Sequence, residues 1–205
     1  MSFFTTFVRN RAASWRKRPV RSLLFGVTLF LMLDIGRYLV WPPVGWLETE
    51  QPRTTSFMEY RQEQWQNGPK AKDGKAMRIR QQWVPLKRIA PALRQAVVTS
   101  EDDLLKRNWD KGRMAAGGST ISQQLAKNLW FTPERSILRK IKEAIMTWRL
   151  ELALDKERIL ELYLNVAEWG NGVYGAEAAA RHYFGKSAAN LSRGEAARLA
   201  VMLPS

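Results

Sequence analysis

The residue types best suited to chemistry are concentrated in residues 117–151, which read GGSTISQQLAKNLWFTPERSILRKIKEAIMTWRLE. Ser119 and Thr120 follow two glycines, and Gln123 stands three residues after Thr120. This is the spacing of a capping box, and it predicts a helix start whose free N–H groups and positive dipole end can face an anion. Basic side chains then follow at Lys127, Arg135, Arg139, Lys140 and Lys142, with Glu143 among them. These groups together suit a diphosphate, although a capped helix followed by a salt-bridged helix would give much of the same pattern.

Composition narrows the chemistry that the chain can perform. The 205 residues carry a formal net charge of +14, no cysteine and a single histidine, His182. The absence of cysteine excludes disulfides and thiolate metal sites, and one histidine excludes a His-rich metal site. It also argues against a Ser-His-Asp triad, and His182 is expected to have a structural role. Chemistry must therefore rest on carboxylates, amides, hydroxyls and cations.

The N-terminal part of the chain predicts a membrane anchor. Residues 1–21 are basic and contain no acid, and residues 22–41 are apolar enough and long enough to cross a bilayer, which takes about 20 residues. Asp34 and Arg37 interrupt this run one helical turn apart, so they can pair or extend toward the headgroups. The basic flank places the N-terminus in the cytoplasm and the rest outside. A cleaved signal peptide is the alternative, but no convincing small-x-small cleavage site follows Leu33.

These features divide the chain into four parts. We expect a cytoplasmic basic segment over residues 1–21, a transmembrane anchor over 22–44, a linker over 45–76 and a catalytic domain over 77–205. The net charge alone would also fit nucleic acid. Nucleic-acid binding is set aside because it does not explain the anchor, and membrane topology already explains the basic N-terminus.

Periodicity predicts a mainly helical domain. Residues 77–84 alternate weakly and predict an extended segment, which Pro85 ends. Pro91 suits the first turn of a helix that is expected to end at Ser100, Glu101 and Asp102. After the glycines, a helix is expected to bury Ile121, Leu125 and Leu129 and to leave Gln124, Lys127 and Asn128 closer to its other face.

Further helix starts are expected downstream. Thr132 and Pro133 form an N-cap followed by proline at the first helical position. The helix that follows carries an apolar stripe, with Arg139, Lys140 and Glu143 away from it: Leu138, Ile141, Ile145, Trp148 and Leu152. On such a helix Arg139 and Glu143 could be no more than an i,i+4 ion pair worth a few tenths of a kcal/mol.

The C-terminal third predicts helices with local braces. Glu161 and Asn165 are spaced i,i+4 and are expected to have a structural rather than a catalytic role. Residues 170–172 predict a turn, and residues 176–183 a closely packed helix ended by Gly185. Ser192 and Glu195 form a second capping box.

Three segments in this order resemble successive motifs of the family 51 glycosyltransferases, the peptidoglycan glycosyltransferases that polymerise lipid II. They are GGSTISQQLAKN, RKIKE and KERILELYLN, the last at residues 156–165, and the resemblance covers roughly residues 77–205. It implies an all-α, lysozyme-like domain of two lobes with a cleft between them. It also implies a substrate, lipid II, and a growing glycan strand as partners.

The resemblance also implies roles for individual residues. AVVTSED resembles the start of the family's first motif, in which the glutamate is the catalytic base, so Glu101 is the expected base; without the resemblance it would be read as a solvated residue at a helix end. Glu143 matches the second acidic residue. The expected substrate-binding side chains are Ser119, Thr120, Gln123, Gln124, Lys127, Asn128, Arg135, Arg139 and Lys140. No cofactor is required, although Mg²⁺ or Mn²⁺ could assist at the diphosphate.

The resemblance places the protein in the bacterial inner membrane. We expect a single pass, a cytoplasmic N-terminus and a periplasmic catalytic domain. Proteins of cell-wall synthesis or division are possible further partners.

The chain departs from the family in two places. The family's first motif normally continues Glu-Asp-x-x-Phe-x-x-His, whereas this chain reads EDDLLKRNWDKGRMAAGGST. Leu105 and Asn108 stand at the spacings of the family's Phe and His. The connection from this motif to Gly117 is also shorter than in the family. An equally good interpretation is that the Phe-to-His segment is missing and that LLKRNWDKGRMAA remains from the following helix. Either way, part of the wall beside the acceptor site is absent. The sequence also stops at residue 205, where family members usually continue for another helix.

Two other functions remain open at this point. The shortened motif could leave a membrane-anchored module that binds lipid II or a division partner without turnover. A lysozyme-like enzyme that cleaves glycans could use the same fold and one glutamate, but it would not need the cationic cluster.

Overall fold

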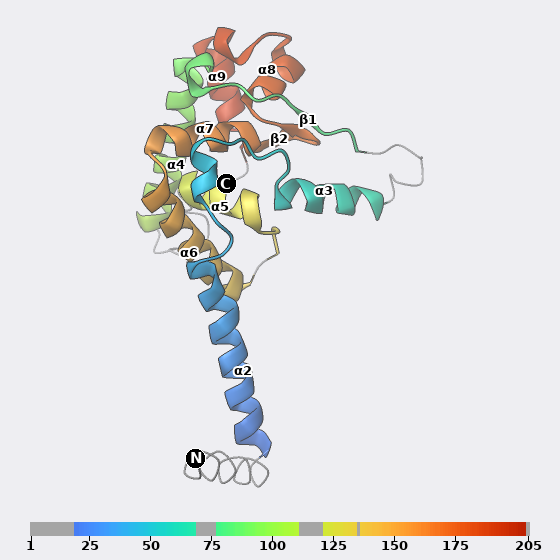
Figure 1. The fold of residues 1–205 in the computed structure, drawn as a ribbon. Helices are drawn as coiled ribbons and strands as arrows, with labels where there is room; N and C mark the ends of the chain where they lie inside the picture. The colour runs from blue at the N-terminus through green and yellow to red at the C-terminus, as the bar shows by residue number, and fades with distance from the viewer. Residues whose placement is uncertain (1–18, 69–76, 111–120, 135, 204–205) are drawn as a thin grey trace. The chain divides into compact units, whose positions relative to one another are not determined.

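The computed structural model describes residues 19–68, 77–134 without 111–120, and 136–203; of residues 101–110 it describes the helical backbone alone (Figure 1). The chain divides into two compact units, Met1–Pro42 and Pro43–Ser205. Each unit is described below by itself.

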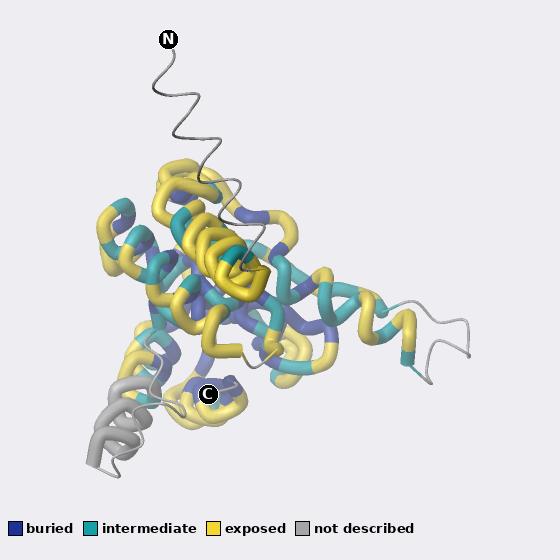
Figure 2. Tube along the Cα trace, turned by 90° about the horizontal axis from the view of Figure 1, so that it is seen from below, coloured by how far each residue is buried: buried dark blue, intermediate teal, exposed yellow. Residues whose placement is uncertain are grey.

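The first unit contains a helix that is long and apolar enough to cross a membrane, where the anchor was expected. Helix α2 covers Pro19–Gly36 and continues into a 3-10 turn, η1, at Arg37–Leu39. The candidate span Pro19–Leu39 has 21 residues, a mean hydropathy of 1.5 and no buried share within the protein. In Figure 2 the helix that continues from the grey N-terminal trace is exposed along most of its length. Asp34 and Arg37 pair at 3.3 Å, so the two charges inside the apolar run partly neutralise each other.

The second unit is mainly helical, which confirms the expected all-α class. Its helices are α3 Ser56–Gln66, α4 Pro91–Asp110, α5 Ile121–Trp130, α6 Ile137–Ala153, α7 Lys156–Val166, α8 Ala176–Phe184 and α9 Arg193–Ala200. Short 3-10 turns lie at η2 Gly45–Glu48, η4 Leu86–Arg88 and η5 Ala188–Asn190. One small sheet is described, in the order β1-β3-β2, from β1 Arg80–Gln81, β2 Glu168–Gly170 and β3 Val173–Tyr174. Strand β1 runs parallel to β3, and β2 is antiparallel to it.

Helix α7 is the centre of this unit. It packs against α5, α6, α8 and η4, while α4 packs on α9 and α3 packs on α5. Its residues Leu162 and Leu164 are fully buried, and Tyr163 is nearly so. Because α7 is covered on several sides, almost its whole second half belongs to the core.

Asn165 and Glu161 on α7 fix the extended segment that leads into α4. The Asn165 amide donates to the carbonyl of Val84 at 2.9 Å, and its oxygen accepts from the N–H of Val84 at 2.9 Å. Glu161 accepts from the N–H of Leu86 at 2.7 Å. Asn165 is fully buried and Val84 nearly so. The i,i+4 pair is therefore a structural brace, as its spacing predicted.

The C-terminal caps also follow the sequence. Helix α8 ends at Gly185, which has a left-handed φ of 68°. Ser192 and Glu195 form a complete capping box at the start of α9. The hydrogen bond from the Ser192 N–H, together with Lys186, lowers the pKa of Glu195 to about 2. The carboxylate therefore stays ionised, and the cap intact, well into the acid range.

Two helix boundaries differ from the prediction. Helix α4 does not end at residues 100–102 but continues to Asp110, because residues 103–110 contain good helix formers and neither glycine nor proline. Helix α6 does not begin at Thr132–Pro133. Ser136 is extended, with φ −145° and ψ 139°, and the first turn closes with a bond from the Lys140 N–H to the Ser136 carbonyl at 3.1 Å.

The brace at Asn165 gives a first prediction. We expect Asn165→Ala to lower the free energy of unfolding by about 3 kcal/mol, because both polar backbone groups of Val84 would be left buried without partners. Circular dichroism during thermal unfolding of the detergent-solubilised protein measures this. Asn190→Ala, at an exposed position, is the matched control and should unfold like the parent. Equal unfolding temperatures for both variants would contradict the brace.

Candidate active site

Helix α5 carries four of the predicted binding residues, and the structure changes the expected orientation of two of them. Leu125 and Leu129 are buried as predicted, but Gln124 and Asn128 are also buried, at 3% and 7% exposure. The expectation of one buried face was therefore wrong. Helix α5 is covered by α3, α6 and α7 on different sides, so a wider part of its circumference faces protein. Gln123 remains half-buried.

Lys127 is the cation that α5 contributes. It is half-buried and donates to the side-chain oxygen of Gln124 at 3.0 Å. The buried amide thus holds the ammonium group in place at the helix surface. This is a polar arrangement that can meet an anion without a large rearrangement.

Ser122 and Glu151 form a polar contact between α5 and α6 that sequence analysis missed. The Ser122 hydroxyl donates to one carboxylate oxygen of Glu151, and Lys156 pairs with the other. Burial alone would raise the pKa of Glu151, but the hydrogen bonds from Lys156 and Ser122 and the charge of Lys156 outweigh it and lower the pKa. Glu151 is therefore an ionised link between the two helices. Only the tertiary packing brings these residues together, so no local pattern could have identified them.

The cationic cluster on α6 is built around a buried carboxylate. Glu143 is 1% exposed and accepts from Arg139 at 2.6 Å and from Lys140 at 2.9 Å, one cation on each oxygen. The side chain of Arg139 is 15% exposed, whereas that of Lys140 is 50% exposed. The i,i+4 pair is therefore more than a surface contact. With both oxygens engaged, Glu143 is suited to orienting the two cations.

The apolar stripe of α6 faces outward. Trp148 and Leu152 are 56% and 69% exposed, Leu138 and Ile141 are also exposed, and Ile137 before them is 83% exposed. Glu143, Met146 and Leu150 occupy the buried side instead. A soluble amphipathic helix normally shows the opposite arrangement. Glu143 and the largely buried Arg139 are thus held on the protein side of α6, and a large apolar surface is left open.

The structure brings most of the predicted site onto two packed helices. Gln123, Gln124, Lys127 and Asn128 lie on α5, and Arg139, Lys140 and Glu143 lie on α6, which packs against it. Ser119, Thr120 and Arg135 lie outside the described residues. Glu101 lies within α4, whose backbone alone is described there. The roles of all these residues remain predictions.

Comparison with known proteins identifies the family. The model of the transglycosylase family matches residues 104–205. The biosynthetic peptidoglycan transglycosylase of Azoarcus sp. (strain BH72) is 46% identical over 199 residues, which cover 90% of this chain and 83% of the relative. The chain belongs to the biosynthetic peptidoglycan transglycosylase family. The relatives of the same name from Herminiimonas arsenicoxydans and Dechloromonas aromatica are 44% and 46% identical and cover 90% and 91% of this chain, and 85% and 84% of their own lengths.

Family membership agrees with the fold, because the transglycosylase domain is an all-α, lysozyme-like one. The matched region contains α5 and α6 and therefore the whole described part of the candidate site. It begins at residue 104, so Glu101 lies just before it. The candidate residues on α5 and α6 thus belong to the part of this transglycosylase that matches the family model.

The buried carboxylate gives a second prediction. We expect Glu143→Ala to destabilise the protein by about 3 kcal/mol, because the largely buried guanidinium of Arg139 loses its counter-charge. Thermal unfolding measures this, with the exposed Glu157→Ala as control, for which we expect a change of at most about 0.5 kcal/mol. The double variant Arg139→Met, Glu143→Met should recover much of the lost stability, because no unpaired charge remains. Equal stabilities of Glu143→Ala and the control would show that the pair is not structural.

Proposed function

We propose that this protein polymerises lipid II into glycan strands and releases undecaprenyl diphosphate, as a peptidoglycan glycosyltransferase of cell-wall synthesis. The observation that carries the proposal is the pair of packed helices in which a buried glutamate, Glu143, holds Arg139 and Lys140, and Gln124 holds Lys127. A leaving diphosphate needs this kind of fixed positive charge. Family membership supplies the reaction class.

The chemistry is an attack by a sugar hydroxyl on a glycosyl diphosphate. The 4-hydroxyl of an incoming lipid II forms a bond to the anomeric carbon of the growing strand, and the bond from that carbon to the diphosphate oxygen breaks. By the family resemblance, Glu101 accepts the hydroxyl proton as general base. The departing diphosphate is a weak base, so it needs charge stabilisation more than a proton. Lys127, Arg139 and Lys140 supply it as negative charge grows on the leaving oxygen.

The described residues do not fit a metal ion held by protein ligands alone. Both oxygens of Glu143 pair with basic side chains, and among the described residues no group of three or more His, Cys, Asp or Glu side chains could hold Mg²⁺ or Mn²⁺. We propose that the basic side chains meet the charge of the diphosphate. A divalent cation would have to arrive with the diphosphate oxygens as its main ligands.

We place the protein in the bacterial inner membrane as a single-pass protein with a periplasmic catalytic unit. The apolar span Pro19–Leu39 and the basic residues before it support this topology. A membrane anchor suits the reaction because lipid II is held in the bilayer by its undecaprenyl chain.

The exposed apolar stripe on α6 supports contact of the catalytic unit with lipid. We propose that the exposed part of this stripe, Leu138, Ile141, Trp148 and Leu152, together with the neighbouring Ile137, enters the bilayer surface. Exposed apolar surface of this size is costly in water and marks a membrane or protein contact. Lys140 and Lys142 on the same helix can then meet lipid phosphates.

Site-specific labelling tests this contact. Because the chain contains no cysteine, a single introduced cysteine is the only thiol that the label can modify. We expect a fluorescent label on Trp148→Cys, in liposomes, to shift to the blue and to be quenched by lipids that carry a nitroxide on the acyl chain. The control is the same label on Asn190→Cys, at an exposed polar site on η5, which should not be quenched. Equal quenching at both positions, or at neither, would rule out a lipid contact specific to α6.

Polymerisation of labelled lipid II tests the proposed function itself. We expect the purified protein to form glycan strands and Glu101→Gln to be slower by about 100-fold or more, because the general base is lost. The control Glu157→Gln, at an exposed position on α7, should keep the parent rate. Protein that binds lipid II but makes no polymer would instead identify a binding module, the alternative that the shortened connection after Asp102 favours. Glycan shortening would identify a lytic enzyme.

A further inference from the structure

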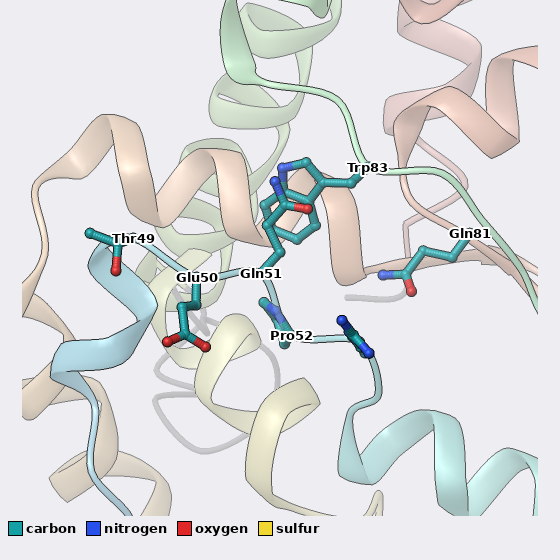
Figure 3. A pocket seen from close by; sticks show the side chains of 7 residues that line it. Thr49, Glu50, Gln51, Pro52, Gln81 and Trp83 are labelled. Carbon is teal, nitrogen blue, oxygen red and sulfur yellow. The ribbon is translucent and has the colours of Figure 1, made fainter.

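The second unit contains a pocket that shares no residue with the candidate active site. Its volume is about 520 Å³, within the range of small-molecule sites in proteins. Figure 3 shows the loop of residues 49–53 on one side and the segment with Gln81 and Trp83 on the other. These residues precede 104–205, the part that matches the transglycosylase family model. The lining of the pocket therefore lies outside the part that matches the family model.

One arginine fixes both walls of the pocket. Arg158 on α7 lies with its guanidinium carbon 5.7 Å from the centre of the Trp83 ring. It also donates to the carbonyl of Leu47 at 2.8 Å and to that of Glu50 at 2.6 Å, and it pairs with Glu161. The indole and the opposing loop are thus held in position, so the pocket is formed before any ligand binds.

The polar groups of the pocket are fixed in a similar way. Gln81 donates its amide N–H to the carbonyl of Asn165 at 3.1 Å, and this bond fixes the side chain in the pocket wall. In Figure 3 the side chains of Glu50 and Gln51 extend from the loop, and those of Gln81 and Trp83 extend from the facing segment. Arg53, also in the lining, is exposed. The site thus combines an aromatic face, two amides, a guanidinium and a carboxylate.

We propose that this pocket binds an N-acetylated sugar that carries an acidic peptide. The flat indole of Trp83 can cover the apolar face of a pyranose ring. The amides of Gln51 and Gln81 match an acetamido group, which offers one donor and one acceptor. Arg53 matches a peptide carboxylate, and Glu50 a peptide amino group. This ligand chemistry occurs in lipid II and in the glycan strand, so the inference rests on the proposed function.

Binding of a soluble fragment tests the pocket without any catalytic step. The probe is the disaccharide-peptide that a muramidase releases from peptidoglycan, titrated into the full-length protein in detergent by calorimetry. We expect Arg53→Ala to weaken binding about tenfold, because a charge-assisted hydrogen bond is lost. The control Arg193→Ala, which removes an equal charge at an exposed site on α9, should bind like the parent. Equal affinities of Arg53→Ala and the parent, or no binding by the parent, would overturn the proposal.

Lipid II polymerisation by the same variants distinguishes the pocket proposal from the proposed function. It also distinguishes lipid II from the glycan strand as the ligand of the pocket. If the parent binds the fragment and Arg53→Ala binds it more weakly, the pocket proposal is supported, whether or not the parent makes polymer. If the parent makes no polymer, only the proposed function is rejected. If the parent does make polymer, a higher KM for lipid II in Arg53→Ala identifies lipid II as the ligand. Shorter strands at an unchanged initial rate identify the glycan strand. The unfolding temperature of Arg53→Ala should match that of the parent, because Arg53 is exposed.

Discussion

The amide of Asn165 satisfies both polar backbone groups of Val84 inside the core, and much of the catalytic unit depends on this contact. It fixes the extended segment that becomes α4 six residues after Pro85, and so it sets where the helix bearing Glu101 begins. Glu161 accepts a hydrogen bond from the N–H of Leu86 in the next turn, and Arg158 donates to the carbonyl of Glu50 in the loop after η2. These three residues are spaced three and four apart on α7, so they share one face of the helix. One polar face of a buried helix thus positions the start of α4 and the pocket beside Trp83.

The two packed helices α5 and α6 match the two-part nature of a lipid-linked substrate. The buried Glu143 pairs with Arg139 and with the half-exposed Lys140, and Gln124 holds Lys127. Apolar surface lies outward on α6. The cost of burying the Glu143 carboxylate is offset only because both of its oxygens are paired. A diphosphate attached to a hydrocarbon chain presents the same combination of an ionic head and an apolar tail.

Local sequence signals predicted the features that depend on local geometry. The brace at Glu161 and Asn165, the capping box at Ser192 and the glycine end of α8 all involve residues within one turn of each other. The ordered motifs also identified the family, because few unrelated chains would repeat them. Burial of Gln124 and Asn128 and the contact of Ser122 with Glu151 could not be predicted, since they depend on which helices surround α5. Thr132 and Pro133 have the residue types of a helix start, but α6 begins later, at Ile137.

The outward stripe of α6 has a consequence for handling the catalytic unit in isolation. Removing residues 1–42 would delete the whole first unit, yet Ile137, Ile141, Trp148 and Leu152 would remain in contact with water. A fragment of this kind is not an ordinary water-soluble globule, and its copies would be driven to associate through these side chains. The exposed apolar side chains of α6 therefore give the second unit an affinity for detergents and lipids even when the anchor has been removed.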